Sequence, residues 1–251
     1  MELQSVDIDY SLEFLSPFHC GAGEGKGFAD RLVRRDQGLL MVPGSTIKGL
    51  IRENYEFLAA CFGINVDGPH FPRSKDERTK YIKSLFSGYD IVYAIFGSPW
   101  QPGTVFFDDA VLDDEWKEYF TDAISEEHKL RLQREQVDQR TRVCIDRYTG
   151  TAARGALFTS EYGKRGLSFN GKIYGSYSYP DDTLDFLPLL LLMAGLKMID
   201  SVGSERSTGC GRCHVEIERL QLNGITKDAA EFLGQLDELQ YLHMAAEEWG
   251  K

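Results

Sequence analysis

The feature that most restricts the fold is a regular alternation of apolar and polar residues near the N-terminus. Apolar residues stand at every second position from Val6 to Phe14, with polar residues between them. This period of two is typical of a β-strand that has one face in the core and the other in solvent. Such a strand requires partner strands and a layer that covers its apolar face. We therefore expect a sheet packed against helices.

The remaining segments follow in the order of an α+β protein. A helix is expected from Ser45, a candidate N-cap, to Phe62, because apolar residues recur there at helical spacing. A second, strongly apolar helix is expected over 184–198. The expected order is a strand (6–14), a glycine-rich loop with a polar tract (19–38), a helix (45–62), a strand (104–112), a long excursion (113–183), a helix (184–198), a glycine loop (203–211) and a strand (213–217). This order predicts a ferredoxin-like (RRM-like) core.

Three segments are expected to decorate this core within a single domain that spans residues 1–251. Residues 63–98 are polar and contain turn residues, so they are interpreted as a lid-like insertion. Residues 140–165 carry glycines and threonines within a basic tract, which predicts a hairpin or an extended loop. Residues 221–251 are rich in Glu and Leu and are expected to form a C-terminal helical extension.

Composition places the chain among globular proteins. Its 251 residues are 42% hydrophobic, which is enough to build a core and excludes a disordered or fibrous chain. Five cysteines, and a beginning without a basic and apolar leader, favour a reducing cytoplasm. The longest apolar run, 186–198, is interrupted by Pro188 and Lys197 and is shorter than the roughly 20 residues that span a bilayer. We expect no membrane segment.

The distribution of charge favours a polyanionic ligand. The formal net charge of -11 by itself argues against nucleic acid, because phosphates are bound by Lys and Arg. Two tracts carry a net positive charge. Residues 24–52 contain six basic and three acidic residues, and residues 129–165 contain nine basic and four acidic residues. An acidic body with two basic tracts can bind a polyanion along one face. The alternative is that these charges cluster on solvated loops without a ligand.

The glycine loop 203–211 and the cysteines beside it have both functional and structural interpretations. Its glycines, with Arg206 between them, allow the backbone to approach a phosphate, or serve as an ordinary helix-to-strand connection. Cys210, Cys213 and His214 spell Cys-x-x-Cys-His, a pattern found in haem and zinc sites. No second Cys-x-x-Cys is present and Cys213 falls on the inward face of a strand. Buried structural thiols are therefore expected, and no structural zinc.

A cluster of acids and arginines at 30–36 has the clearest chemical character. The segment Asp30-Arg31-Leu32-Val33-Arg34-Arg35-Asp36 follows the first strand and its glycine-rich loop. A carboxylate among arginines can orient or deprotonate a ribose 2′-hydroxyl, or hold a divalent cation beside a phosphodiester. A surface salt-bridge cluster is the structural alternative. The sequence motifs of serine hydrolases, metalloproteases and dinucleotide-binding proteins are absent from the chain.

Four segments together resemble the backbone subunit of type III CRISPR RNA-guided interference complexes, a branch of the RAMP superfamily. They are Asp30-x-x-Val33-x-Arg35-Asp36, Val42-Pro43-Gly44-Ser45-Thr46-Ile47-Lys48-Gly49-Leu50-Ile51-Arg52, Ile145-Asp146-Arg147-x-Thr149-Gly150-x-Ala152, and the loop Gly203-Ser204 to Gly209-x-Gly211-Arg212. The similarity spans roughly residues 5–220. The resemblance implies a ferredoxin-like RNA-binding protein with a hairpin thumb. It also implies assembly with copies or paralogues of the chain and with other type III subunits.

The resemblance further implies roles for single residues. Asp30 occupies the place of the aspartate that cleaves target RNA with a divalent metal ion, Mg²⁺ or Mn²⁺, and Asp36 resembles a structural partner. The thumb would wedge into the guide–target duplex, where Tyr148 or Phe158 offers a stacking surface. The residues expected to bind RNA are Lys26, Arg31, Arg35, Ser45, Lys48, Arg52, Arg147, Arg154, Gly203, Ser204, Arg206 and Gly209.

Three functional hypotheses stay open on these grounds. The first is a guide-RNA-binding subunit that cleaves complementary target RNA through Asp30. The second is a guide-RNA-binding scaffold of the same assembly that does not cleave. The third is an endoribonuclease that processes the guide precursor, for which His19 beside the first glycine loop is the candidate base.

Overall fold

The protein is built around a central β-strand. The computed structural model describes residues 3–24, 29–62, 64, 91–97, 102–178 and 186–236. The predicted N-terminal strand is confirmed as β1 (Gln4–Phe14), whose side chains alternate between buried and more exposed positions. It pairs antiparallel with β10 (Ser168–Tyr177) on one side and with β11 (Cys213–Leu222) on the other. Because both of its edges are hydrogen-bonded and one face is buried, β1 forms the centre of the sheet.

Shorter strands extend this sheet on both sides. β12 (Ile225–Lys227) pairs with β11, and both β6 (Val105–Phe107) and β7 (Ala110–Leu112) pair with β10. β5 (Leu39–Val42) pairs with β7, and β4 (Arg35–Asp36) forms the edge. The strand order is β12-β11-β1-β10-β7-β5-β4, with β6 beside β10.

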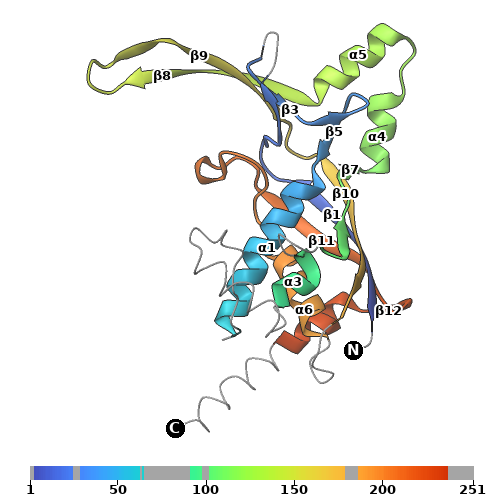
Figure 1. The fold of residues 1–251 in the computed structure, drawn as a ribbon. Coiled ribbons are helices and arrows are strands. Elements are labelled where there is room, and N and C mark those ends of the chain that lie inside the picture. Colours follow the sequence, from blue (N-terminus) through green and yellow to red (C-terminus); the bar gives the residue numbers. More distant parts are fainter. Residues whose placement is uncertain are drawn as a thin grey trace.

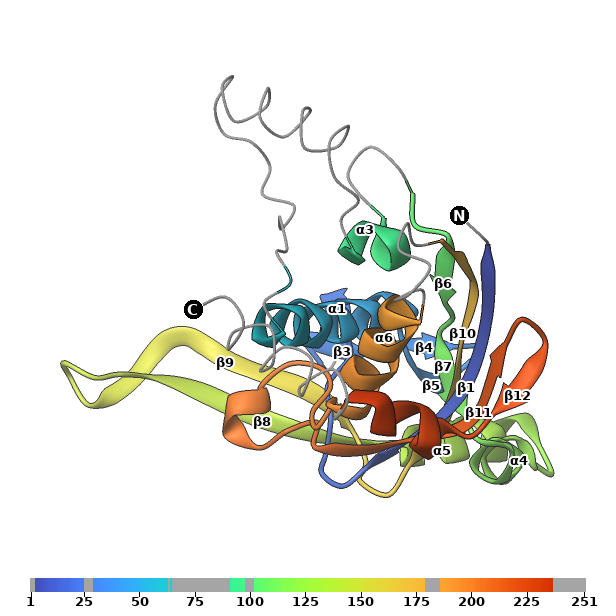
Figure 2. The ribbon, with the colours of Figure 1, turned by 90° about the horizontal axis from the view of Figure 1, so that it is seen from below.

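Helices cover one face of this sheet (Figure 2). α1 (Gly44–Cys61) packs against α6 (Leu187–Lys197), and the short helix α3 (Ile91–Phe96) lies beside them. α6 is buried on all sides, as expected for a helix that is apolar all round. Gly195 allows the close approach, because a Cβ there would lie 3.1 Å from the carbonyl oxygen of Ile51. No helix in the described ranges is both long enough and apolar enough to cross a membrane.

A long β-hairpin projects from this body (Figure 1). Its strands are β8 (Val137–Asp146) and β9 (Thr151–Gly163), which pair antiparallel. Together with β2 (Gly21–Glu24) and β3 (Arg31–Val33) they form a second sheet in the order β2-β3-β9-β8. The outer part of the hairpin carries exposed side chains, whereas Tyr162 at its base is fully buried. The hairpin is therefore anchored at one end only.

Two helices lead into the hairpin. α4 (Asp114–Thr121) and α5 (Glu126–Glu135) begin at side-chain caps, because Asp113 and Ser125 accept hydrogen bonds from N–H groups of the first turns. The next residue, Gln136, is fully buried. Its side-chain amide bonds to backbone atoms of the β4–β5 segment at 2.8 and 3.0 Å. This contact ties the start of the hairpin to the edge of the large sheet.

The predicted α+β, ferredoxin-like core with a hairpin thumb is confirmed, but two segments differ in detail. The single strand expected over 104–112 is two strands, β6 and β7, which pair with β10 in turn. The stretch 19–38, expected to be a glycine-rich loop and a polar tract, contains β2, β3 and β4. These strands have two to four residues each, which is too few for a period of two to be recognised in the sequence.

The expected insertion and C-terminal extension are also corrected in part. Residues 91–97, assigned to the insertion 63–98, belong to the core, because Ile91 and Ile95 are buried in it. The stretches 65–90 and 98–101 lie outside the described residues. The extension expected as helical over 221–251 starts with strand residues, followed by a helix at 229–236. Residues 237–251 lie outside the described part of the chain.

The contact between β10 and β1 predicts a large cost for any side chain at Gly171. A Cβ there would lie 2.2 Å from Cζ of Tyr10, whose ring is buried. We expect Gly171→Ala to lower the free energy of unfolding in urea by about 1–3 kcal/mol, the usual cost of overpacking. Gly49→Ala is the control, because a Cβ on this exposed side of α1 meets no atom within 4 Å. Gly49→Ala should raise the free energy of unfolding by roughly 0.5–1 kcal/mol. Equal urea midpoints for Gly171→Ala and Gly49→Ala would contradict the packing described for Gly171.

Candidate nucleic-acid interface

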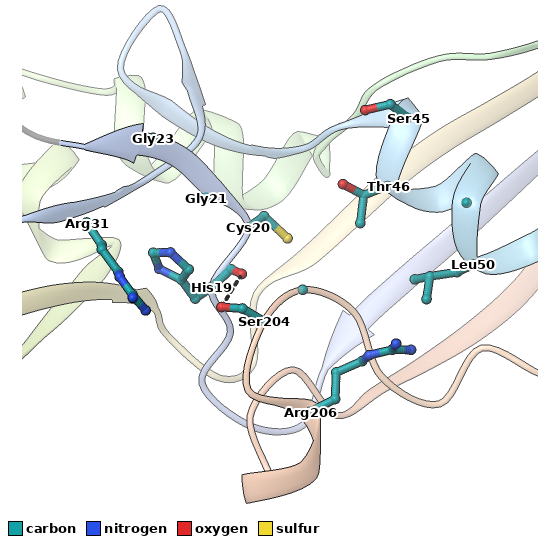
Figure 3. Close-up of a pocket in the computed structure, with 12 residues that line it drawn as sticks. His19, Cys20, Gly21, Gly23, Arg31, Ser45, Thr46, Leu50, Ser204 and Arg206 are labelled. Atoms are coloured by element: carbon teal, nitrogen blue, oxygen red, sulfur yellow. Dashed lines mark hydrogen bonds between the residues drawn. The ribbon is translucent and has the colours of Figure 1, made fainter. Parts of the chain in front are cut away.

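A cavity of about 730 Å³ lies where three segments of the chain meet (Figure 3). The segments are residues 19–23 with Arg31, the first turns of α1, and the glycine loop after α6. Segments far apart in the sequence thus form one surface. The lining includes five of the residues expected to bind RNA: Arg31, Ser45, Gly203, Ser204 and Arg206. It also includes His19, Cys20, Gly21, Gly23, Thr46, Gly49 and Leu50.

The N-terminal end of α1 forms one wall of the cavity. The N-cap residue is Pro43, so the expectation that Ser45 caps the helix is wrong. Gly44 is required where the helix begins, because a Cβ there would lie 2.1 Å from the carbonyl oxygen of Phe107. Its N–H donates to the Asp109 carboxylate at 2.7 Å. Ser45 is thereby left to line the cavity, at a helix end whose dipole attracts anions.

The glycine loop forms a second wall through backbone contacts that require glycine. Gly203 has a φ of +96°, and a Cβ there would lie 2.5 Å from the carbonyl oxygen of His19. The same oxygen accepts hydrogen bonds from the N–H of Ser204 at 3.0 Å and from its hydroxyl at 3.4 Å. The loop is thus fixed against the segment before β2. Arg206 projects from it and lies 3.9 Å from the Glu53 carboxylate.

The third wall carries a histidine and an arginine. The buried His19 ring approaches the carbonyl oxygen of Glu161 with Nδ1, at 2.7 Å. Because a carbonyl oxygen only accepts hydrogen bonds, Nδ1 carries the proton. Arg31 is exposed, with its guanidinium 5.5 Å from the centre of the Phe158 ring. Figure 3 shows Arg31 and Arg206 on either side of His19, so positive charge flanks the cavity.

On α1, the two basic residues expected to bind RNA lie outside the cavity lining. Lys48 lies over the Phe107 ring at 5.6 Å, and partial burial, with repulsion from Arg52, lowers its pKa. Arg52 forms an ion pair with Glu56 at 2.7 Å. Neither side chain lines the cavity, although Ser45 and Gly49, which stand three residues before them, do. Helical spacing alone therefore does not decide which residues of α1 line the cavity.

Asp30 is exposed and bound to the base of the hairpin. Its carboxylate oxygen Oδ2 accepts a hydrogen bond from the N–H of Thr159 at 2.7 Å. Its own N–H donates to the carbonyl oxygen of Thr159 at 2.8 Å. A carboxylate suits Mg²⁺ or Mn²⁺, and Mg²⁺ is usually held by one or two carboxylates together with substrate phosphates. The described residues contain no group of three or more His, Cys, Asp or Glu that could hold a metal ion. A metal at Asp30 would be held by this carboxylate together with water and phosphate oxygens.

Arg35, five residues after Asp30, has a structural partner. Arg35 forms an ion pair with the Glu161 carboxylate at 2.9 Å, and Glu161 is buried. The same carboxylate accepts a hydrogen bond from the N–H of Val33 at 3.4 Å. Asp36 is exposed on β4. The salt-bridge interpretation of the 30–36 cluster thus applies to Arg35, while Asp30 and Arg31 remain accessible.

The tip of the hairpin presents an aromatic ring and a cation to solvent. Tyr148 is 98% exposed, and its N–H donates to the Asp146 carboxylate at 2.8 Å. This hydrogen bond lowers the pKa of Asp146. Arg147 is exposed beside them. Lys26 and the side chain of Arg154, both expected to bind RNA, lie outside the described parts of the structure.

The cysteines beside the glycine loop are buried, as predicted. Cys210 and Cys213 are 6% and 7% exposed. Burial raises the pKa of Cys213 to about 12. His214 is exposed instead and pairs with Glu216 at 3.0 Å. The Cys-x-x-Cys-His string therefore does not bring its three side chains to one point.

Sequence reasoning missed residues that shape the site, and it included several that do not line the cavity, Gly209 among them. Thr46 and Leu50 line the cavity, and the buried stripe on the opposite side of α1 could have identified them. Glu205 adopts a left-handed conformation in the glycine loop, for which its residue type gives no signal. Gly209 follows the 3₁₀ turn Arg206–Thr208 and lies outside the cavity lining.

Comparisons with known proteins place this fold in one family. Two chains from cryo-EM structures of Type III-B Cmr-beta, one in the apo state and one bound to cognate target RNA, both match with a TM-score of 0.54. The apo chain is 13% identical to this chain and the RNA-bound chain is 12% identical. Each match covers 84% of this chain, and the matches cover 97% of the apo chain and 96% of the RNA-bound chain. No curated protein sequence matches the chain. The sequence model of the RAMP superfamily matches residues 11–214. Since this match covers most of the sequence, the chain belongs to the RAMP superfamily.

Proposed function

We propose that this chain is a backbone subunit of a type III CRISPR effector complex that binds guide RNA and cleaves complementary target RNA through Asp30. The observation that carries the proposal is the cavity of about 730 Å³ on which Arg31, Arg206 and the N-terminus of α1 converge. RNA is a polyanion, so it binds where positive charge is accessible. In this cavity, accessible arginines and a helix N-terminus lie together on an otherwise acidic protein.

The chemistry of the cavity fits an RNA backbone better than a base. Arg31 and Arg206 present planar guanidinium groups, which match phosphate oxygens in pairs. Ser45 and Ser204 add hydroxyl groups that bond to phosphate or sugar oxygens. Gly49 and the other glycines of the lining leave room for a chain to lie close to the protein backbone. Base pairing with the target would then supply sequence selectivity.

The hairpin is assigned to the guide–target duplex. Tyr148 at its tip is almost fully exposed, and Arg147 lies beside it. An exposed aromatic ring stacks on an unpaired base, and the neighbouring cation contacts its phosphate. A rigid hairpin that carries both groups is suited to displace a nucleotide from the duplex.

The structures that share the fold support the assembly. They are described as Type III-B Cmr-beta complexes, and one of them holds cognate target RNA. By this likeness, the proposed partners are guide RNA, target RNA, copies or paralogues of this chain, and other type III subunits.

Cleavage is assigned to the carboxylate of Asp30. A divalent ion, Mg²⁺ or Mn²⁺, would supply the Lewis acid that stabilises charge on the reacting phosphate. Thr159 holds one carboxylate oxygen through its N–H and so orients the other. The 2′-hydroxyl releases its proton to water as its oxygen attacks the neighbouring phosphorus. The bond to the 5′-oxygen breaks, and this oxygen takes up a proton from water. The products are a 2′,3′-cyclic phosphate and a 5′-hydroxyl group.

A guide-binding scaffold that does not cleave is the second candidate. It is favoured by the paired hydrogen bonds between Asp30 and Thr159, which give the aspartate a structural role at the hairpin base. The two candidates share the cavity and differ only in the chemistry of Asp30.

The cavity assignment predicts that two arginines set the salt dependence of RNA binding. Arg31→Gln with Arg206→Gln should weaken binding of a single-stranded guide RNA. The slope of log K against log salt should fall by about 1.4, because each phosphate contact on a single strand contributes about 0.7. Filter binding across a salt series measures both quantities.

A matched control removes the same charge elsewhere. Arg131 and Arg134 are exposed on α5, away from the cavity lining. Arg131→Gln with Arg134→Gln should leave affinity and slope close to wild type. If the two double variants lose affinity equally, the cavity is not the RNA site.

The assignment of Asp30 predicts a separation of cleavage from binding. Asp30→Asn keeps an oxygen for the N–H of Thr159 but removes the negative charge, so the hairpin base should stay intact. In the assembled complex with Mg²⁺, we expect cleavage of a complementary RNA to be lost while guide RNA is retained. Asp36→Asn, at an exposed site on β4, is the control and should cleave as wild type does. Loss of both guide RNA and cleavage in Asp30→Asn would make Asp30 structural instead.

A further inference from the structure

Glu205 has a backbone conformation that is unusual for its residue type. Its φ is +63°, in the left-handed region, and it stands in the glycine loop directly before Arg206. Residues other than glycine are held there only where surrounding contacts compensate. The Glu205 side chain is 19% exposed, so its carboxylate is largely removed from water. The partners of that carboxylate therefore decide the shape of the loop.

Those partners come from the hairpin. Arg142 of β8 donates from Nη1 to Oε2 of Glu205 at 2.6 Å. The hydroxyl of Tyr162 in β9 lies 3.1 Å from each carboxylate oxygen. The hydrogen bond to Glu205 raises the pKa of Arg142, and burial, with the bond to Glu205, raises that of Tyr162. Both groups keep their protons at neutral pH, so the contacts are charge-assisted.

Tyr162 in turn connects Glu205 to another wall of the cavity. Its ring is fully buried, with the guanidinium groups of Arg140 and Arg142 at 4.9 and 5.4 Å from its centre. The ring of His19, which lines the cavity, lies 5.7 Å from it, centre to centre. One tyrosine at the hairpin base thus touches residues from two of the three cavity walls.

We propose that Glu205 is a positioning residue that links the β8–β9 hairpin to the glycine loop and holds both in the geometry that binds RNA. The loop and the hairpin then move as one unit, because the carboxylate accepts from both hairpin strands. The next residue is Arg206, so a change at the hairpin base is transmitted directly to a cation of the cavity. This proposal rests on the proposed function, in which the cavity binds RNA.

Two native cysteines allow the link to be measured in the full chain. Cys61 at the end of α1 and Cys144 on β8 are exposed, and the other three cysteines are buried. Spin labels on this pair report the distance between the helix layer and the hairpin by pulsed EPR. Glu205→Gln should broaden the distance distribution. It should also weaken binding of a single-stranded guide RNA by roughly fivefold or more, a usual size for coupling between sites.

A second variant removes the same contact from the other side. Arg142 is 37% exposed, so Arg142→Gln should fold normally and reproduce both effects. The double variant should be no worse than either single variant, because each one removes the same interaction. Arg219→Gln is the matched control, since it breaks an ion pair of 2.7 Å with Asp9 on the large sheet. It should change neither readout, and thermal unfolding establishes that every variant is folded.

The outcomes separate this proposal from the proposed function. If the distance distribution of Glu205→Gln equals that of wild type, the link between hairpin and loop is overturned. If RNA binding is lost while the distance distribution stays unchanged, Glu205 contacts RNA directly. Additive losses in the double variant would overturn it as well. A wild-type chain that binds no RNA would contradict the proposed function, while the distance measurement still decides the link.

Discussion

The candidate site depends on how the base of β9 is fixed to the body of the protein. Phe18 and Gly163 exchange backbone hydrogen bonds at 3.1 and 2.8 Å, and a Cβ on Gly163 would overlap with the Phe18 ring. Two residues earlier, Glu161 binds His19 through its carbonyl oxygen and Arg35 through its carboxylate. Buried polar contacts of this kind are costly to break singly. They allow a long hairpin to project from a base of defined geometry, and they place the cavity beside it.

Elements with a clear period were predictable from the sequence, and elements defined by distant partners were not. β1 has apolar residues at every second position from Val6 to Phe14, and α6 is apolar up to Lys197, so the central strand and the buried helix could be predicted. β3 has three residues, and its pairing with β9 joins Arg31 to Ser160, far along the chain. α3 is a six-residue apolar run next to a polar stretch, where composition hides its place in the core. Short elements take their structure from tertiary contacts, which local propensity does not contain.

The same distinction applies to the cavity. Basic tracts and the family resemblance identified Arg31 and Arg206, because charge and loop motifs can be read along the chain. They did not show that Lys48 lies over Phe107 instead of facing the cavity, since direction is set by packing. Glu205 gave no signal, because its left-handed backbone and its hairpin partners exist only in the folded chain. Residue type was thus predictable for the site, and side-chain direction was not.

The central claim is that an RNA backbone lies in the cavity between α1, the glycine loop and the segment before β2. Ultraviolet crosslinking of RNA to the assembled complex, followed by mass spectrometry of the linked peptides, tests it most directly. The account predicts crosslinks in peptides that contain His19 to Gly23, Ser45 to Leu50 and Gly203 to Arg206. Crosslinks confined to the open face of the large sheet, such as peptides around Arg219, or an assembly that holds no RNA, would contradict it.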